Sequence, residues 1–194
     1  MDFVGTLASG SELELPYISV KGGRNLMENK KEPVKLMGVA PELPENPQYF
    51  TELAIPEIIK IPDIKPDIEQ LVSVMVEAEI SSMRLIDTPC VKSYEGQMLS
   101  GKKLVLELKL REKVVYVADE ASQPVHAAHY EEVLKSVFII VPRYVEGIPI
   151  EAMLKANRVK VTPYIEDIYA EQKDKRIVFK NITLLIDVTF PCGN

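Results

Sequence analysis

The chain has 194 residues, of which 46% are hydrophobic and 27% are charged, and its formal net charge is −6 at pH 7. These values are typical of a soluble globular protein and exclude disordered, collagen-like and mini-protein classes. Surfaces that bind nucleic acid or anionic lipid need clustered Lys and Arg, so the acidic balance argues against both kinds of partner.

The sequence predicts neither a membrane span nor a secretory leader. Its longest apolar run, Val137–Val141, is far shorter than the roughly 18–20 apolar residues that a span requires. The first residues, Met1–Leu7, include an Asp and a Gly and lack the charged, apolar and small regions of a signal peptide. We therefore expect the protein to be made and kept in the cytoplasm.

Proline recurs every few residues through the first third of the chain. Each proline removes an amide donor and clashes with the preceding helical turn, so long helices are excluded there. Val39–Pro47 should be extended or turned, and Ile55–Pro62 is typical of a short edge strand bounded by prolines. We expect residues 1–65 to form a proline-rich extended segment before a β domain at residues 66–194, unless the two make one continuous fold.

Two segments alternate apolar and polar residues with a period of two, which is the pattern of a half-buried strand. The apolar positions are Val72, Val74, Val76, Ala78 and Ile80 in the first segment, and Leu104, Leu106, Leu108 and Leu110 in the second. Leucine favours helices, but a spacing of two would scatter these leucines around a helix, whereas it aligns them on a strand. Periodicity therefore outranks propensity, and both segments are predicted strands.

Shorter segments continue the β pattern toward the C-terminus. Val114–Val117 and Ser136–Val141 are apolar runs of strand length. Pro149–Asn157 fits one short helix with proline near its start, whereas His129–Lys135 is ambiguous. Near the end, the apolar residues change from odd to even positions at Lys180–Asn181, and a turn or β-bulge there would return them to one face.

These patterns together predict a mainly β fold, an antiparallel β-sandwich-like arrangement with little helix. No alternation of helices and strands indicates a parallel sheet. A largely β chain must also protect its strand edges, and pairing of edges between subunits is one physical route to an oligomer or fibre.

The segment Gly96–Lys103 nearly matches the phosphate-binding pattern Gly-x4-Gly-Lys-Ser/Thr. Its last position holds Lys103 where the pattern needs a hydroxyl for magnesium. An alternating strand follows where a helix N-terminus should gather the phosphate. We therefore interpret the segment as the approach to a hairpin, and we predict no cofactor.

The two histidines, His126 and His129, are the candidate metal ligands. On a helix their spacing would place both on one face, with Asp119, Glu131 or Glu132 as a third ligand. On a strand the same spacing places them on opposite faces. We expect a hydrogen-bonded structural role and no bound metal, and we keep a metal- or ligand-binding β module centred on these histidines as the alternative function.

The sequence predicts no catalytic residues. It has no Gly-x-Ser-x-Gly elbow and no Cys with a His partner nearby in the sequence. Its carboxylates fall on strand positions expected to face solvent, such as Glu77, Glu79 and Glu107. We expect a protein that is not an enzyme, and a hydrolase assembled from residues distant in sequence is the remaining alternative.

Cys90 and Cys192 each follow a proline and are the candidates for cross-linking. In a reducing cytoplasm both would remain thiols. Pairing within one chain would close a loop of about 100 residues and add about 4.7 kcal/mol to stability in the entropic model. Pairing between chains would instead join neighbouring subunits, and the sequence leaves all three states open.

Five runs of residues occur in an order and spacing known from one family. In chain order they are Lys65–Gln70, Ser93–Glu107, Val115–Asp119, Gln123–His129 and Phe138–Pro142. They resemble the SPOCS-domain family, named for spore coat and cortex-related proteins of endospore-forming Firmicutes, over roughly residues 65–190. The run Gln-Pro-Val-His-Ala-Ala-His at Gln123–His129 is the most specific, and Phe50–Leu53 resembles the upstream part of stand-alone clostridial members.

The resemblance implies a self-associating, non-enzymatic structural or assembly protein of the bacterial endospore envelope, in the coat, the exosporium or at the spore surface. Its implied partners are further copies of itself and other envelope proteins. Some members carry a C-terminal lysin-motif domain, but none is seen before Asn194, so we do not expect peptidoglycan binding by that route. The resemblance implies no catalytic residues and assigns no role to His126 or His129.

Overall fold

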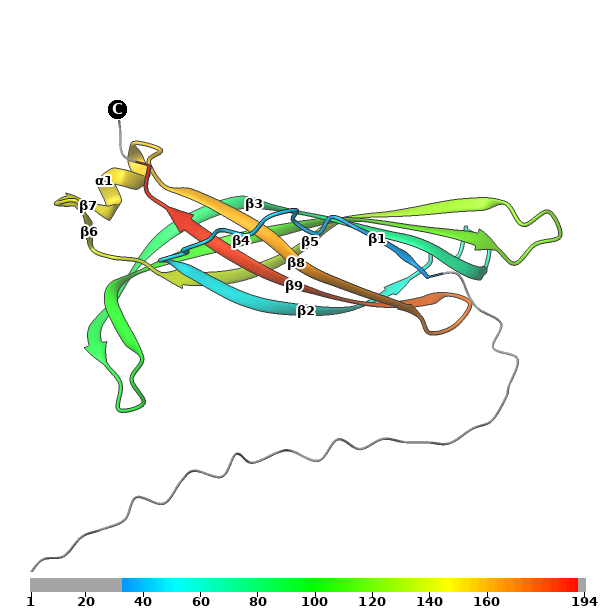
Figure 1. Ribbon diagram of the computed structural model, residues 1–194, viewed down its shortest axis with the longest axis horizontal. Coiled ribbons are helices and arrows are strands. Elements are labelled where there is room, and N and C mark those ends of the chain that lie inside the picture. Colours follow the sequence, from blue (N-terminus) through cyan, green and yellow to red (C-terminus); the bar gives the residue numbers. More distant parts are fainter. Residues whose placement is uncertain (1–32, 192–194) are drawn as a thin grey trace, which may run out of the picture. The chain divides into compact units, whose positions relative to one another are not determined.

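The computed structural model describes residues 33–191, apart from the side chains of residues 131–134. Its elements are β1 (Lys35–Met37), β2 (Phe50–Lys60), β3 (Ile68–Lys92), β4 (Met98–Ala118), β5 (Val125–Ile140), β6 (Tyr144–Val145), β7 (Ile148–Pro149), α1 (Ile150–Lys155), β8 (Lys160–Gln172) and β9 (Ile177–Thr189). Figure 1 shows the long strands running in similar directions, one layer over the other. In this part of the chain, no helix is long and apolar enough to cross a membrane.

The strands form two main sheets that share one hydrophobic core. The four-stranded sheet has the order β1-β3-β4-β5, the three-stranded sheet has the order β2-β9-β8, and β6 and β7 make a small separate pair. Neighbouring strands are antiparallel, except that β1 runs parallel to β3. Buried side chains from both main sheets meet between the layers. The predicted mainly β, antiparallel, sandwich-like fold with little helix is therefore confirmed.

The leucine-rich segment forms the centre of the four-stranded sheet. Leu104, Leu106, Leu108 and Leu110 are each at most 1% exposed, and the same even-numbered face stays buried through Ala118. β4 pairs with β3 on one side and β5 on the other. The prediction of a strand from the two-residue period is confirmed, because this spacing turns every leucine toward the opposite sheet.

The other alternating segment is a strand too, but the predicted apolar face is wrong at its beginning. Val72 is 38% exposed, whereas Leu71 and Val74 are buried. The pairing of β3 with β4 shifts register between Ile68 and Gln70 and again between Leu71 and Ser73. Each β-bulge adds one residue to β3 and so exchanges the odd-numbered and even-numbered positions between the two faces of the sheet. Val72 therefore turns outward.

The predicted turn or bulge at Lys180–Asn181 is also wrong. β9 runs through this point without a register shift against either neighbour, apart from a bulge in β8 between Ile165 and Asp167. Its even positions face the core from Val178 to Val188, while Ile177 and Phe179 lie on the other face and are half-buried. The parity seems to change in the sequence only because a lysine, Lys180, occupies a core position.

The proline-rich segment contributes edge strands. The predicted edge strand Ile55–Pro62 lies largely in β2, which pairs with β9 alone, and Pro56 is accommodated there because an edge strand leaves one side free of partners. Ile55, Ile59 and Ile61 belong to the common core. β1 and β2, which precede residue 65, therefore lie in the same two sheets as the strands that follow it.

The short helix is where the sequence predicts it. α1 begins directly after Pro149, which holds its N-cap position, and buries Ile150 and Met153. The ambiguous segment His129–Lys135 lies in β5, because its backbone completes the antiparallel ladder with β4. A local pattern that fits helix or strand is thus decided by the neighbouring strand.

β3 and β4 extend well beyond the rest of their sheet. β5 accompanies β4 only as far as Lys103, so residues 87–102 form a two-stranded ribbon that we call the β3–β4 arm. Figure 1 shows this hairpin, in green, projecting away from the layered strands. Val91, Tyr94 and Met98 on the arm are 52%, 111% and 59% exposed. A lone two-stranded ribbon is marginally stable in water. Exposed apolar side chains grouped on such a ribbon are typical of an interaction surface.

Candidate functional site

Three charged side chains from three strands meet between the two sheets. Lys180 of β9 and Glu112 of β4 have side chains that are 0% and 1% exposed, and Glu57 of β2 is 21% exposed. The Lys180 Nζ lies 3.0 Å from Glu57 Oε2 and also contacts Glu112 Oε1. We call Glu57, Glu112 and Lys180 the inter-sheet ion cluster. Charged groups are seldom fully buried, so the cluster stands out from the aliphatic core around it.

Burial dominates the electrostatics of Glu112. Desolvation raises the pKa of this carboxyl, the hydrogen bond and charge of Lys180 oppose the rise, and the Glu57 carboxylate adds to it. The second carboxylate oxygen of Glu112, Oε2, is buried without a hydrogen-bond partner. One cation therefore compensates two carboxyl groups, and Glu112 holds a proton more readily than an ordinary glutamate does.

A tyrosine lies beside the inter-sheet ion cluster on the neighbouring strand β5. Tyr130 of β5 lies opposite Glu112 in the ladder, and its hydroxyl donates a hydrogen bond to the Lys60 carbonyl at 3.0 Å. Burial raises the pKa of Tyr130 to about 12.

Because the side chains of Lys180 and Glu112 are buried, a dissolved substrate has no access to them. Any chemistry of the inter-sheet ion cluster must therefore take place among its own members.

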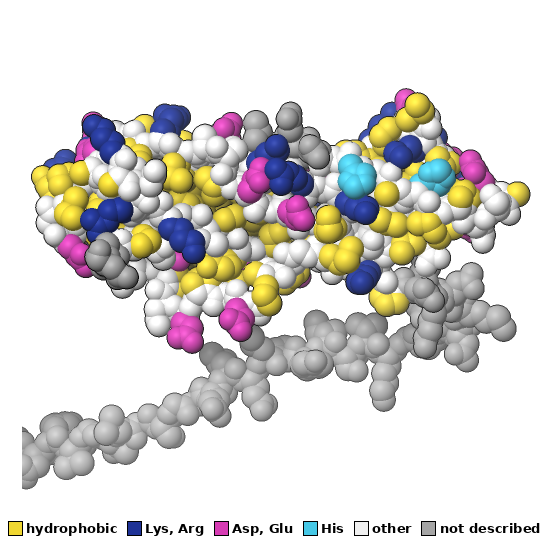
Figure 2. Space-filling model, turned by 90° about the horizontal axis from the view of Figure 1, so that it is seen from above, with side chains coloured by type: hydrophobic (Ala, Val, Ile, Leu, Met, Phe, Trp, Pro, Cys, Tyr) yellow, Lys and Arg dark blue, Asp and Glu magenta, His cyan; other side chains and the backbone are white. Residues whose placement is uncertain are grey.

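The structure does not bring the predicted metal ligands together. His126 and His129 both lie on β5, three residues apart, so they point to opposite faces of the strand. His126 faces inward and stacks on Tyr116 with ring centroids 5.9 Å apart, while His129 is exposed opposite Lys113. Figure 2 shows the two histidines as separate patches. Within residues 33–191, no group of three or more His, Cys, Asp and Glu side chains is placed to hold a metal ion.

The phosphate-loop look-alike is a β-hairpin. Ser93 and Gln97 close the turn with a backbone hydrogen bond of 2.8 Å, and β4 begins at Met98. Gly101 has φ +96°, and a Cβ there would lie 2.3 Å from Arg143 Nε, so glycine leaves room for this guanidinium. The interpretation as a hairpin approach is confirmed, and the glycine serves side-chain packing.

Only one of the two predicted cross-linking cysteines lies in the described part of the chain. Cys90 is an exposed free thiol on the β3–β4 arm, opposite Ser100. Cys192 lies outside the described residues. A cross-link between the two, or between chains, therefore stays a prediction.

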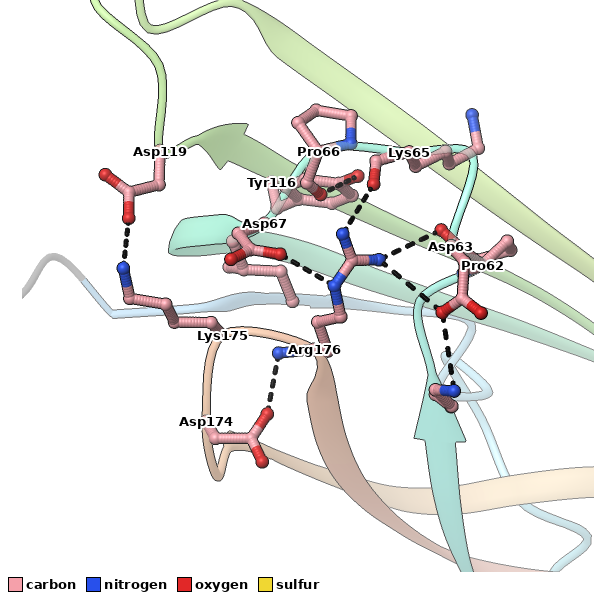
Figure 3. Close-up of polar contacts among 12 residues, drawn as sticks. Pro62, Asp63, Lys65, Pro66, Asp67, Tyr116, Asp119, Asp174, Lys175 and Arg176 are labelled. Carbon is pink, nitrogen blue, oxygen red and sulfur yellow. Dashed lines mark hydrogen bonds and ion pairs between the residues drawn. The ribbon is translucent and has the colours of Figure 1, made fainter.

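A second polar network joins the two sheets at one end, and we call it the Arg176 network (Figure 3). Arg176, in the turn between β8 and β9, places its Nε 2.7 Å from Asp67 and donates hydrogen bonds to the carbonyls of Pro62 and Lys65 at 3.2 and 3.1 Å. Its own carbonyl accepts a 2.9 Å bond from the Ile61 amide. The planar guanidinium thus fastens the β8–β9 turn to the connection between β2 and β3.

Three of the five runs that carry the family resemblance meet at this network. The Tyr116 hydroxyl donates to the Pro66 carbonyl at 3.1 Å, while its ring stacks on His126. Gln123 Nε2 donates to both carboxylate oxygens of Glu69 at 3.0 and 2.8 Å, and the Asp119 amide donates to the Asp67 carbonyl. Runs at residues 65–70, 115–119 and 123–129 therefore hold one another in place.

We expect Arg176→Ala to lower the free energy of unfolding by about 1–2 kcal/mol, because it removes the hydrogen bonds from the guanidinium to the Pro62 and Lys65 carbonyls. The loss is moderate, because these partners are at least partly exposed and water can solvate them in the variant. Urea unfolding of the two proteins measures the difference. The matched control is Lys175→Ala in the same turn, whose ammonium is 68% exposed and pairs only with Asp119. Equal losses from the two substitutions would contradict a specific role for the guanidinium.

A hollow lies near the start of β2 and the end of β9. It has a volume of about 520 Å³, and its lining includes Tyr49, Tyr144, Asp187 and Phe190. Asp187 is 5% exposed, its Oδ1 has no hydrogen-bond partner, and burial raises the pKa of its carboxyl.

Sequence reasoning missed the inter-sheet ion cluster. Glu112 and Lys180 are 68 residues apart, and neither belongs to a recognised motif. One signal was present: each occupies a position whose parity matches the buried residues on its strand, Leu110 beside Glu112 and Ile182 beside Lys180. Opposite charges on two predicted core faces could have indicated a buried pair.

Comparison with protein-family models, curated proteins and solved structures gave no match to this chain. Membership of the SPOCS-domain family therefore stays a prediction that depends on the five sequence runs. What the geometry adds is that three of these runs contact one another in space.

Proposed function

We propose that this chain is a non-enzymatic structural protein of the bacterial endospore envelope that associates with further copies of itself. The observation that carries the proposal is the convergence of motif residues in the Arg176 network. Tyr116, Gln123 and His126 are occupied by partners within the fold, as expected of residues that maintain a scaffold. The resemblance supplies the envelope role, and the fold supplies surfaces that suit assembly.

The β3–β4 arm is the surface we assign to self-association. It projects as a two-stranded ribbon with Val91, Tyr94 and Met98 exposed, and burial of these side chains against another subunit would stabilise it. β5 offers a second route for strand addition, since among the strands of residues 33–191 it lies at the edge of its sheet beside β4. Cys90, a candidate for cross-linking, lies on the same arm, so a cross-link between chains through Cys90 would form at this contact.

Assembly of the full chain tests the proposal. Wild-type protein should form particles larger than a monomer in sedimentation velocity and ordered assemblies in electron micrographs. The double substitution Val91→Lys and Met98→Lys should return it to monomer, because charges on the arm oppose burial. Ile64→Lys is the matched control, since Ile64 is 94% exposed but lies away from the arm.

The envelope role has its own test. An epitope-tagged copy expressed during sporulation should fractionate with the spore and be labelled in its outer layers by immunogold microscopy. Wild-type protein that stays monomeric at high concentration would contradict self-association. Tagged protein found only in the mother-cell supernatant would contradict the envelope role.

A further inference from the structure

The inter-sheet ion cluster holds a lysine amine, an acceptor carboxyl and a second carboxyl in one dry place. We propose that Lys180 and Glu112 condense spontaneously into an isopeptide bond that links the three-stranded sheet to the four-stranded sheet, with Glu57 as the proton carrier. This inference stands apart from the proposed envelope role, because it depends only on contacts inside one chain.

The geometry satisfies the first requirement, which is proximity. Lys180 Nζ contacts Glu112 Oε1, so the carboxyl carbon Cδ lies one covalent bond beyond the contacting atom. The two groups arise from facing strands of different sheets and are fixed by the ladders on both sides of β9. Reacting groups held in this way reach effective concentrations of about 10⁵–10⁸ M, far beyond those in solution.

The second requirement is a proton on the acceptor carboxyl and none on the amine, which one proton transfer from Lys180 to Glu112 supplies. Burial raises the pKa of Glu112, so its carboxyl takes up a proton more readily than an ordinary glutamate does. The side chains of Lys180 and Glu112 are 0% and 1% exposed, and Glu112 Oε2 has no hydrogen-bond partner. Glu57, whose Oε2 lies 3.0 Å from Lys180 Nζ, is 21% exposed and lies where it can accept a proton from the amine and return it.

The steps balance without any external reagent. A proton first passes from the Lys180 ammonium to the Glu112 carboxylate. The amine lone pair then attacks Glu112 Cδ, and the C–N bond forms while an N–H proton passes to the Glu57 carboxylate. Glu57 returns that proton to the departing hydroxyl, the C–O bond breaks, and one water leaves. No atom is oxidised or reduced, and Glu57 ends in its starting state.

Intact mass spectrometry of the folded full-length protein tests the proposal. Wild type should be lighter than its sequence mass by one water. Trypsin should then release a branched peptide in which Glu112–Lys113 is joined to residues 177–194, since an acylated Lys180 is no longer cleaved. A linked peptide that contains residues 36–60 would place the bond on Glu57 and overturn the assignment of the acceptor.

Three variants sharpen the result. Lys180→Arg should keep its full sequence mass, because a guanidinium does not acylate. Glu57→Gln should slow bond formation at least tenfold while both reactants remain. Glu112→Gln should lose ammonia instead of water and reach the mass of linked wild type.

The wild-type protein alone can overturn the proposal, so it does not depend on any variant folding. Full sequence mass in the folded wild-type chain after prolonged incubation would do so, as would a loss of water that peptide mapping places elsewhere. In either case the cluster would be an ion pair only.

Discussion

We expect Lys180→Met to have a free energy of unfolding at pH 7 about 3–5 kcal/mol below that of wild type with its ion pair unlinked, which is the usual cost of removing one partner from a buried ion pair. Methionine fills a similar volume, so the loss reports charge more than packing. It leaves the buried Glu112 carboxyl with no cation and beside a second carboxyl, Glu57. Denaturant unfolding followed by circular dichroism measures the change.

The matched comparison is the double variant Lys180→Met, Glu112→Leu. It replaces the buried pair with apolar groups, so it should be more stable than Lys180→Met alone by about 1–3 kcal/mol. Neither variant can form the proposed isopeptide bond, so the comparison holds whether or not wild type is linked. A double variant less stable than Lys180→Met would mean that Glu112 is not the source of the penalty.

The same variant should show a particular pH dependence. In the unlinked ion pair, Lys180 lowers the pKa of Glu112 against the rise caused by burial and Glu57. Without Lys180 that pKa rises further, so folded Glu112 keeps a proton that the unfolded chain releases above the ordinary glutamate pKa of 4.5. Stability of Lys180→Met should therefore be highest below this value and fall as pH rises through the folded pKa. A deficit that is unchanged between acidic and neutral pH would contradict this account.

The second large effect is expected at the core face of β9. Ile182→Ala should lower the free energy of unfolding by about 2–5 kcal/mol, because Ile182 is 0% exposed and the deletion leaves a cavity between the sheets. Phe179→Ala, three residues away on the other face, should cost about 1 kcal/mol or less, since it loses only surface contacts with Tyr169 and Lys173.

This pair of substitutions shows whether Phe179 faces the core or the outer side of β9. A bulge at Lys180–Asn181 would turn Phe179 into the core, and Phe179→Ala would then cost about 3–5 kcal/mol as a buried aromatic deletion does. The midpoints and slopes of urea unfolding for the two variants distinguish these outcomes. A larger loss from Phe179→Ala than from Ile182→Ala would contradict the straight course of β9.

Where the sequence predicted structure correctly, the information was local. The spacing of Leu104 to Leu110 indicates a strand because side chains alternate faces at every residue, whatever the strand pairs with. Pro149 at the start of α1 and the prolines around β2 act through their own backbone geometry. These features need no knowledge of distant residues.

Where it failed, the deciding partner was remote. Val72 turns outward because bulges form against β4, and a bulge is a property of two strands. His126 finds its partner in Tyr116, which comes from the neighbouring strand. His126 and His129 could not be resolved from spacing alone, since three residues mean one face on a helix and two faces on a strand.

The sequence by itself determined the strands that alternate or are bounded by prolines, the short helix and the antiparallel sandwich-like class, because alternation and proline act within a few residues. Only the tertiary structure decided that Lys180 lies in the core, because a buried ammonium is tolerated only where Glu112 and Glu57 reach it from other strands. Lys180, which interrupts the apolar alternation of β9 in the sequence, is thus a core residue. The carboxyl groups that compensate its charge lie beside it only in the folded chain.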